Sequence, residues 1–254
     1  MSDAVIVERD GSFARITLDR PEKRNSLSLD VLRSLIAAFT AVGESDAVGV
    51  VLAANGPVFS AGHDFAEMAG TDLEQARQLF TTCTRVMDTI QSIPQPVVAR
   101  VHGLATAAGC QLVASCDLAI AAESAGFAIP GGKGGLFCHT PVVAVVRSIG
   151  RKRALEMAYT GDVVDARTAA DWGLVNRVVP AAELDDATHD LITRSVRGST
   201  LSKTLGKQGF YAQVDLPQDK AYEYAIAVMA AAATTADAQE GFVAFLEKRP
   251  PRFS

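Results

Sequence analysis

The sequence predicts an α/β fold in which buried strands alternate with helices, followed by a helical C-terminal region. The first observation is that short apolar runs recur at Val48–Ala53, Val97–Val101 and Leu118–Ala122. The second is that segments with helical spacing separate these runs, an alternation typical of a largely parallel, buried sheet. The third is that helical patterns dominate after about Pro141, where only Leu174–Val179 has the character of a strand.

The individual elements follow from local patterns. Two strands are expected at Ala4–Glu8 and Phe13–Asp19, joined by an Asp-Gly turn. Ser28 can cap a helix that runs to about residue 42, and a longer helix is expected over Leu73–Ile90, where two prolines then end it. Another helix follows Gly109. The C-terminal part predicts six more helices, over Arg151–Tyr159, Ala166–Trp172, Glu183–Arg197, Lys203–Val214, Gln218–Ala232 and Ala236–Lys248.

Composition excludes several classes of protein. The 254 residues are 48% hydrophobic and 21% charged, with a net charge of −5, which is typical of a soluble globular chain. The longest basic run is Arg151–Arg153, so a nucleic-acid surface is not expected. No Walker loop or GxGxxG turn is present, which argues against nucleotide hydrolysis and a dinucleotide cofactor. The four cysteines form no CxxC pair, so neither a disulfide framework nor a metal site is expected.

The distribution of apolar residues also bears on location. No uncharged apolar stretch approaches the roughly 18 residues that would indicate a membrane span. The N-terminal residues show no charged segment followed by an apolar one, the pattern of a targeting leader. We therefore expect a cytoplasmic protein that does not bind a membrane.

Two glycine-containing passages from a strand into a loop can carry chemistry. In Val97–Asp117 a strand passes through Gly103 and small residues into a helix, and in Val58–Met68 a second strand leads into FSAGHD. Small residues let backbone N–H groups approach a ligand oxygen, and the helix dipole favours negative charge there. Close packing of a buried helix would produce the same composition.

Together, FSAGHD and HGLATAAGCQLVASCD resemble the two signature segments of the crotonase family, also called the enoyl-CoA hydratase/isomerase family. The resemblance extends over nearly the whole chain, including RPEKRNSLS (20–28), YTGDVVDARTAADWGLVNRVVP (159–180) and EGFVAFLEKRPPRF (240–253). It implies a spiral core of ββα turns over residues 1–195, which holds an acyl-CoA site. It also implies a helical region over residues 196–254, which makes trimer contacts and closes over CoA, with trimers often paired into hexamers.

The resemblance implies that two backbone N–H groups hold the thioester carbonyl of an acyl-CoA and stabilise the enolate. At the matching positions these donors are the amides of His63 and Ala108. The imidazole of His63 could act as well. The interpretation we favour is that only its amide is used, since backbone amides can fill this role unaided.

Hydratases of the family carry two glutamates that hold and activate water, and neither is present here. The first position is Gln111, whose amide exchanges no proton at neutral pH, and the second is Gly131. The chain also resembles a branch that shares both replacements, the mitochondrial enoyl-CoA hydratase-domain-containing proteins and their bacterial relatives. Hydratase activity is therefore expected to be weak or absent.

Other ionisable residues lie in the same loop: Lys133, Cys138 and His139. His139 matches a position where dienoyl-CoA isomerases place an aspartate that works on the substrate. Because a histidine titrates near neutral pH, we expect it to be the acid or base. Alternatively, it is hydrogen-bonded in a helix cap before Pro141. Cys138 is the weaker candidate, since no feature marks its thiol as activated.

The resemblance further implies contacts to CoA. Lys23 and Arg24 match the loop around the adenine and the ribose phosphate, where cations pair with phosphate. Phe245 and Lys248 match positions that reach CoA, commonly across a subunit boundary. Three more positions match the segment that cradles adenine and pantetheine: Ala61, Asp64 and Phe65. Any one of these charges could simply be a solvated surface group, but their conjunction favours the ligand.

Two functional hypotheses follow. The first is an enzyme of the enoyl-CoA hydratase/isomerase type, which stabilises a thioester enolate and uses CoA thioesters as substrates, with no further cofactor. The second is a non-catalytic acyl-CoA-binding protein that has kept the fold. A different reaction that uses His139, such as isomerisation, hydrolysis or decarboxylation, stays open as an alternative.

Overall fold

The structure is a computed structural model that describes residues 4–253, and it confirms the predicted α/β class. Parallel pairing joins all neighbouring strands of the larger sheet except β1 and β2, which are antiparallel. In spatial order its strands are β1 (Val5–Asp10), β2 (Phe13–Leu18), β3 (Gly49–Ala54), β4 (Val97–Val101), β6 (Leu118–Ala122) and β9 (Arg177–Val179). A smaller sheet consists of β5 (Ala105–Thr106), β7 (Gly126–Ala128) and β8 (Val164–Asp165).

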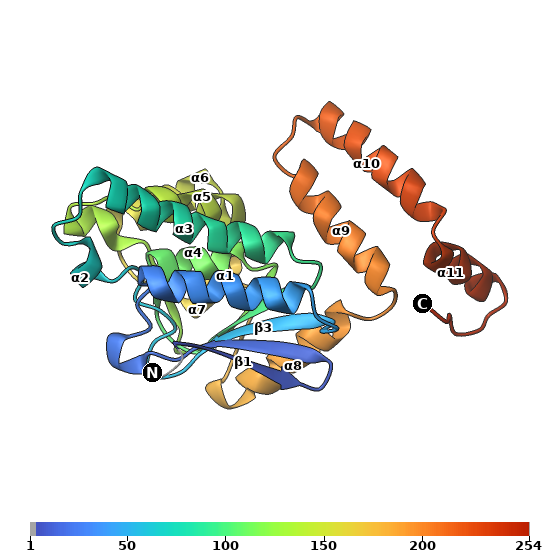
Figure 1. The fold of residues 1–254 in the computed structure, drawn as a ribbon, viewed down its shortest axis with the longest axis horizontal. Coiled ribbons are helices and arrows are strands. Elements are labelled where there is room, and N and C mark those ends of the chain that lie inside the picture. Colours follow the sequence, from blue (N-terminus) through green and yellow to red (C-terminus); the bar gives the residue numbers. More distant parts are fainter. Residues whose placement is uncertain (1–3, 254) are drawn as a thin grey trace.

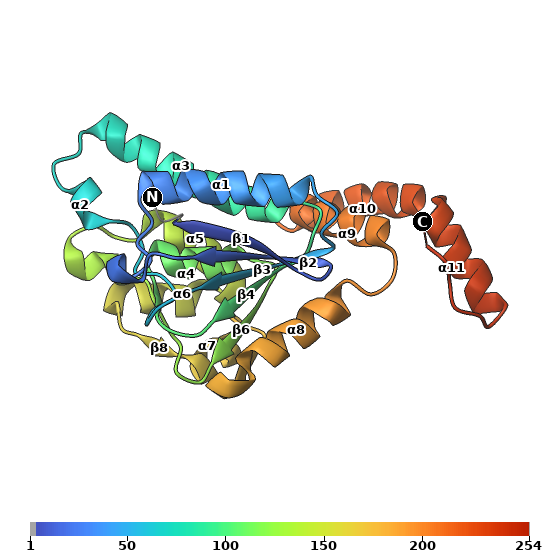
Figure 2. The same cartoon turned by 60° about the horizontal axis from the view of Figure 1, so that its bottom comes forward.

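Helices cover both faces of the larger sheet (Figures 1 and 2). Side chains alternate across β3, where Val50 and Leu52 pack into the larger core and Val51 packs against α8 (Leu184–Ser195). Burial on both faces explains why this strand is apolar throughout. On the side of the larger core lie α1 (Leu29–Gly43), α3 (Leu73–Ser92), α4 (Ala108–Ser115), α5 (His139–Ile149), α6 (Arg151–Thr160) and α7 (Ala166–Trp172).

Local signals place the first helices where the sequence predicts them. The hydroxyl of Ser28 accepts a hydrogen bond from the backbone N–H of Val31 at 3.3 Å, so it caps α1 as expected. Asp72 and Gln75 form a capping box at the start of α3, with N–H···O distances of 2.8 and 3.0 Å. The helix ends at Ser92, two residues beyond the predicted end.

Two differences from the sequence analysis show the effect of packing. The sequence analysis assigns no helix to His139–Ile149, yet this segment forms α5, in which Val145 and Ile149 pack against the core. The expected strand Leu174–Val179 is shorter: Leu174 and Val175 are buried, but only Arg177–Val179 pairs with β6. Tertiary contacts decide both cases.

The last three helices extend away from the rest of the chain as an arm, which we define as α9 (Thr200–Gln213), α10 (Gln218–Ala233) and α11 (Ala236–Leu246) (Figures 1 and 2). No residue of α9 or α10 is buried within the single chain. Large apolar side chains of α10, including Ile226 and Met229, are therefore exposed.

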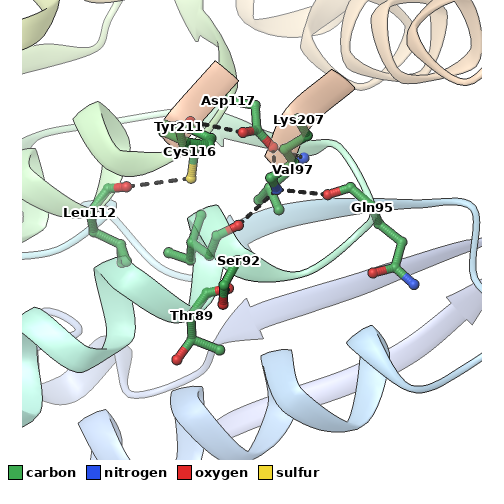
Figure 3. Close-up of polar contacts among 10 residues, drawn as sticks. Thr89, Ser92, Gln95, Val97, Leu112, Cys116, Asp117, Lys207 and Tyr211 are labelled. Atoms are coloured by element: carbon green, nitrogen blue, oxygen red, sulfur yellow. Dashed lines mark hydrogen bonds and ion pairs between the residues drawn. The ribbon is translucent and has the colours of Figure 1, made fainter. Parts of the chain in front are cut away.

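A buried polar cluster attaches the arm to the core (Figure 3). The Lys207 ammonium donates to the Asp117 carboxylate at 2.7 Å and to the backbone carbonyls of Ile90 and Gln95 at 2.8 Å each. The Tyr211 hydroxyl donates to the second oxygen of Asp117 at 2.8 Å. The side chains of Lys207 and Asp117 are only 8% and 15% exposed, so this ion pair is largely desolvated.

The sequence analysis divides the chain into residues 1–195 and 196–254. Of these, residues 1–3 and residue 254 lie outside the described residues. Within residues 4–253, no helix is both long enough and apolar enough to cross a membrane.

Candidate active site

A half-open cavity of about 680 Å³ lies between the two signature segments and the loop before α5. Its walls come from some of the residues in segments 61–69 and 130–141, together with Phe80 and residues 106–108. None of the described residues that line it is an Asp, Glu, Lys or Arg; its titratable side chains are His63, Cys138 and His139. Within residues 4–253, no cluster of His, Cys, Asp or Glu could hold a metal ion.

Close backbone contacts bring the two signature segments together. The N–H of Thr106 donates to the carbonyl of Ser60 at 3.0 Å, and a Cβ at Gly109 would come within 2.6 Å of that same carbonyl oxygen. Gly62 has a φ of +83°, and a Cβ there would lie 2.9 Å from the Cβ of Ala107. Glycine is therefore required at both positions for this approach.

The amides of His63 and Ala108 lie at this junction, and both residues line the cavity. In the described part of the chain, no backbone hydrogen bond uses either N–H. Ala108 is the first residue of α4, where the helix geometry leaves the N–H unpaired and the dipole favours negative charge. Two free donors therefore stand at the wall of one cavity.

The His63 side chain is held in its neutral form. Its Nδ1 lies 3.3 Å from the carbonyl oxygen of Leu27, and its ring packs edge-on against Phe80 with centroids 5.4 Å apart. Burial lowers the pKa of the imidazole, an effect only partly offset by the bond to Leu27 and the nearby charge of Glu67. Nε2 has no hydrogen-bond partner among the described residues.

Gln111, at the first of the two glutamate positions, does not line the cavity. It is buried in α4, and its side-chain oxygen lies 4.0 Å from the Cys83 sulfur of α3, whose thiol can donate to it. Burial raises the pKa of Cys83 to about 12, so this neighbour is a neutral thiol. The amide of Gln111 therefore faces α3.

Gly131, at the second position, has no space for a side chain. A Cβ there would come within 2.2 Å of the carbonyl oxygen of Leu136 and 2.7 Å of the Cys138 sulfur. The loop is drawn in at this point because the N–H of Gly131 donates to that sulfur at 3.2 Å and its carbonyl accepts from Leu136. A glutamate would require this loop to be rebuilt.

Of the other candidates in the loop, His139 and Cys138 line the cavity and Lys133 does not. His139 is exposed and is the first residue of α5, with its ring 5.2 Å from that of Phe137. The cap residue itself is Cys138, and no side chain caps this helix, so the helix-cap alternative for His139 is not found. Burial raises the pKa of Cys138, and Lys133 pairs with Asp162 at 2.7 Å.

The positions expected to contact CoA fall into two groups. Ala61 and Phe65 line the cavity, and the N–H of Ala61 donates to the carbonyl of Arg24 at 3.0 Å, which places residues 23 and 24 beside it. Asp64, which lies between Ala61 and Phe65 in the sequence, does not line the cavity. Its carboxylate caps α2 (Phe65–Met68). Phe245 belongs to α11, Lys248 follows that helix by two residues, and neither lines the cavity of its own chain. Figures 1 and 2 show α11 at the end of the arm away from α2.

Sequence reasoning missed some of the lining residues. Phe80 lies in the expected helix over Leu73–Ile90, where the sequence analysis names no site residue, and its side chain forms part of the cavity wall. Phe137 and the neighbouring prolines and glycines of its loop gave no helical or strand pattern to interpret. Ala107 has a left-handed φ of 52°, for which an alanine carries no sequence signal.

Comparison with known proteins agrees with this architecture. The sequence profile of the enoyl-CoA hydratase/isomerase family matches residues 8–254. A Homo sapiens protein named enoyl-CoA hydratase domain-containing protein 3, mitochondrial, is 45% identical over 94% of this chain and 80% of its own length. Its Danio rerio counterpart is 43% identical over 100% of this chain and 88% of its own. A crystal structure of an enoyl-CoA hydratase from Mycobacterium smegmatis superposes with a TM-score of 0.96, at 45% identity and 99% coverage of both chains.

These relatives correct one expectation. The sequence analysis expects a cytoplasmic protein, but the relatives from Homo sapiens, Danio rerio and Rattus norvegicus are all named as mitochondrial. The cytoplasmic assignment is therefore wrong. It rested on the absence of a leader pattern, which is a weak indicator of where a folded domain resides.

Proposed function

Because the chain belongs to the enoyl-CoA hydratase/isomerase family, we propose that it binds an acyl-CoA thioester in the 680 Å³ cavity and stabilises the enolate form of that thioester. The thioester oxygen accepts hydrogen bonds from the amides of His63 and Ala108. The observation that carries this proposal is the pair of backbone N–H groups left without a partner at one cavity wall. Such donors act most strongly where charge develops in a site that excludes water.

The same geometry argues against efficient addition of water. Hydration needs a group that activates water and a group that protonates the carbon, and Gln111 and Gly131 supply neither. The Gln111 amide faces Cys83, and there is no room for a side chain at position 131. We therefore propose an enolate-stabilising enzyme of this family in which hydratase turnover is weak.

His139 is the proposed acid or base. It lines the cavity, it is exposed, and its side chain takes no part in capping α5. These features support a role in moving a proton between the substrate and solvent. No further cofactor is proposed.

CoA is proposed to lie across residues 23, 24, 61, 64 and 65, whose backbones meet at the hydrogen bond between Ala61 and Arg24. Phe245, which belongs to α11, and Lys248, which follows it, do not line the cavity of their own chain. We propose that they contact CoA bound to a neighbouring copy in a trimer or hexamer. The exposed apolar side chains of α10 support such an assembly, because a single chain leaves them in water.

One observation favours a second function, non-catalytic binding of acyl-CoA. None of the described residues that line the cavity carries a carboxylate or an ammonium group, and binding by itself requires no group that transfers protons. The two functions differ in one measurable property, the exchange of protons on the carbon next to the thioester carbonyl.

The test combines binding and exchange. Titration calorimetry with butyryl-CoA measures affinity, and NMR in D₂O measures loss of the α-proton signal. Enolate stabilisation predicts exchange faster than in buffer, whereas tight binding without exchange establishes the non-catalytic function. With crotonyl-CoA, we expect hydration at least about 10²-fold slower than in a hydratase with both glutamates assayed alongside. Comparable turnover would contradict the argument from Gln111 and Gly131.

Two variants separate the amide of His63 from its side chain. His63→Ala keeps the N–H and is expected to have a mild effect on exchange. Gly62→Pro displaces that N–H, because proline cannot adopt the φ of +83° found there, and is expected to abolish exchange. Circular dichroism of both variants checks that the fold is retained.

A further inference from the structure

Ala107 has a strained backbone at the wall of the cavity. Its φ of 52° and ψ of −119° belong to a region that L residues avoid. Three other described non-glycine residues have a positive φ, namely Arg24, Asn25 and Lys248, and none of them lines the cavity. Strained residues persist where the surrounding structure holds them, and they cluster at functional sites.

The side chain of Ala107, a residue of the cavity wall, is a single methyl group. Its N–H donates to the carbonyl of Ala128 at 2.8 Å, and its own carbonyl accepts from the N–H of Gln111 at 3.0 Å. Both polar backbone atoms are therefore engaged within the fold. Because Ala107 is only partly buried and lines the cavity, the methyl is the group left to meet a ligand.

The backbone conformation also fixes where this methyl lies. At a ψ of −119°, the Cα–Cβ bond of an L residue is nearly eclipsed with the bond to the next nitrogen, which here belongs to Ala108. Gly62 lies on the other side of the methyl: a Cβ added to this glycine would be 2.9 Å from the methyl carbon of Ala107. The methyl thus stands beside one proposed amide donor, against the segment that carries the other.

We propose that the methyl of Ala107 is a specificity-determining group, which selects acyl chains that are unbranched at the carbon next to the thioester carbonyl. The inference rests on the proposed function. A carbonyl oxygen held by the Ala108 amide brings its own carbon and the adjacent chain carbon against this methyl. A CH₂ group fits in that space, whereas a second methyl on that carbon overpacks it.

The test compares two ligands of equal carbon number, butyryl-CoA and 2-methylpropanoyl-CoA, by titration calorimetry. The unmodified protein is expected to bind the branched ligand about tenfold more weakly. Ala107→Gly removes the methyl and relieves the strained conformation. We expect it to bring the two Kd values within about threefold of each other and to raise Tm by about 2 °C.

Ala114→Gly is the matched control. Ala114 lies in α4, the helix that Ala107 immediately precedes, but not at the cavity, and glycine in a helix interior is unfavourable. It is expected to lower Tm and to leave the ratio of Kd values unchanged. Equal binding of both ligands by the unmodified protein, or an unchanged ratio in Ala107→Gly, overturns the inference. Failure to bind either ligand overturns the proposed function instead.

Discussion

At the scale of single residues, the cavity differs from a two-glutamate site in more than side-chain identity. Gln111 is turned towards Cys83, and the backbone around Gly131 fills the space that a side chain would need. A glutamate at position 111 would therefore be buried in an uncharged environment. A glutamate at position 131 would collide with the backbone. Among the described residues, the titratable side chains left at the cavity wall are His63, Cys138 and His139, and His139 is the proposed acid or base.

His139→Gln tests the proposed acid or base. If the imidazole transfers a proton in the transition state, kcat should fall about 10²-fold, while the Kd for acyl-CoA stays within about twofold. The pH dependence of kcat should also change, because the imidazole proposed to exchange the proton is removed. Steady-state kinetics and calorimetry measure the two quantities.

His189→Gln is the control for this variant, since His189 packs against Phe13 on the opposite side of the sheet. It should leave kcat unchanged. An unaltered kcat in folded His139→Gln would remove His139 from the mechanism and favour the non-catalytic function.

At the scale of elements, two polar clusters attach helices to the larger sheet. Asp185, at the start of α8, accepts two hydrogen bonds from Arg100 at 2.7 Å each and one from Arg15 at 3.0 Å. The bonds from Arg100 are the main cause that lowers the pKa of Asp185 to about 2. Lys207 and Asp117 form the corresponding attachment for α9.

Asp185 should make stability depend on pH in the acid range. Because the pKa in the folded state lies near 2 and the ordinary value is 3.8, the stabilisation is present above pH 3.8 and is lost as pH falls towards 2. The Asp185 side chain is 59% exposed, so we expect Asp185→Asn to lose only about 1 kcal/mol of stability at neutral pH.

Thermal unfolding followed from pH 5 to pH 2 measures this effect. Asp185→Asn should show a shallower loss of stability than the unmodified protein in this range. Asp186→Asn, at the exposed neighbouring position of the same helix, is the control. Parallel curves for Asp185→Asn and the unmodified protein would refute the assignment.

Lys207→Met should destabilise the attachment of the arm. It leaves the Asp117 carboxylate largely buried, with only the Tyr211 hydroxyl and the N–H of Val97 as donors. Breaking a buried ion pair on one side costs about 3–5 kcal/mol, whereas replacing both partners costs less. Chemical denaturation at fixed protein concentration should therefore show a larger loss for Lys207→Met than for the double variant Lys207→Met/Asp117→Asn. If Lys207→Met and the double variant lost the same free energy of unfolding, Lys207 and Asp117 would have no energetic coupling.

At the scale of the whole molecule, the arm is the part that a single chain leaves uncovered. α9 and α10 bury no residues of their own, although α10 carries large apolar side chains. Burial of apolar surface drives association, so a second copy is the simplest partner for this surface.

Light scattering should give three or six times the chain mass of 26.7 kDa. The double variant Ile226→Glu/Met229→Glu places charges on the exposed face of α10 and should yield smaller species, with weaker CoA binding because the neighbouring arm is lost. Val7→Glu, at an exposed position on the edge strand β1, is the control. A single-chain mass for the unmodified protein at micromolar concentration would rule out the proposed assembly.

The sequence by itself determined the parts of the fold that depend on neighbouring residues. Caps such as Ser28 and the alternation of apolar runs with helical spacing indicated most strands and helices, since these signals act within a few residues. The signature segments also identified the family and the position of the cavity. The roles of His63, Ala108 and His139 stay predictions.

Only the tertiary structure decided what depends on contacts between distant segments. The orientation of Gln111, the lack of space at Gly131 and the strained turn at Ala107 each result from packing against residues that no local pattern names. The same holds for α5, whose valines form a helix because the core covers one of its faces, and for Lys207, which meets Asp117 across 90 residues of sequence. Local propensities differ by fractions of a kcal/mol per residue, whereas burial of a side chain contributes about 1.5–3 kcal/mol, so packing prevails where the two disagree.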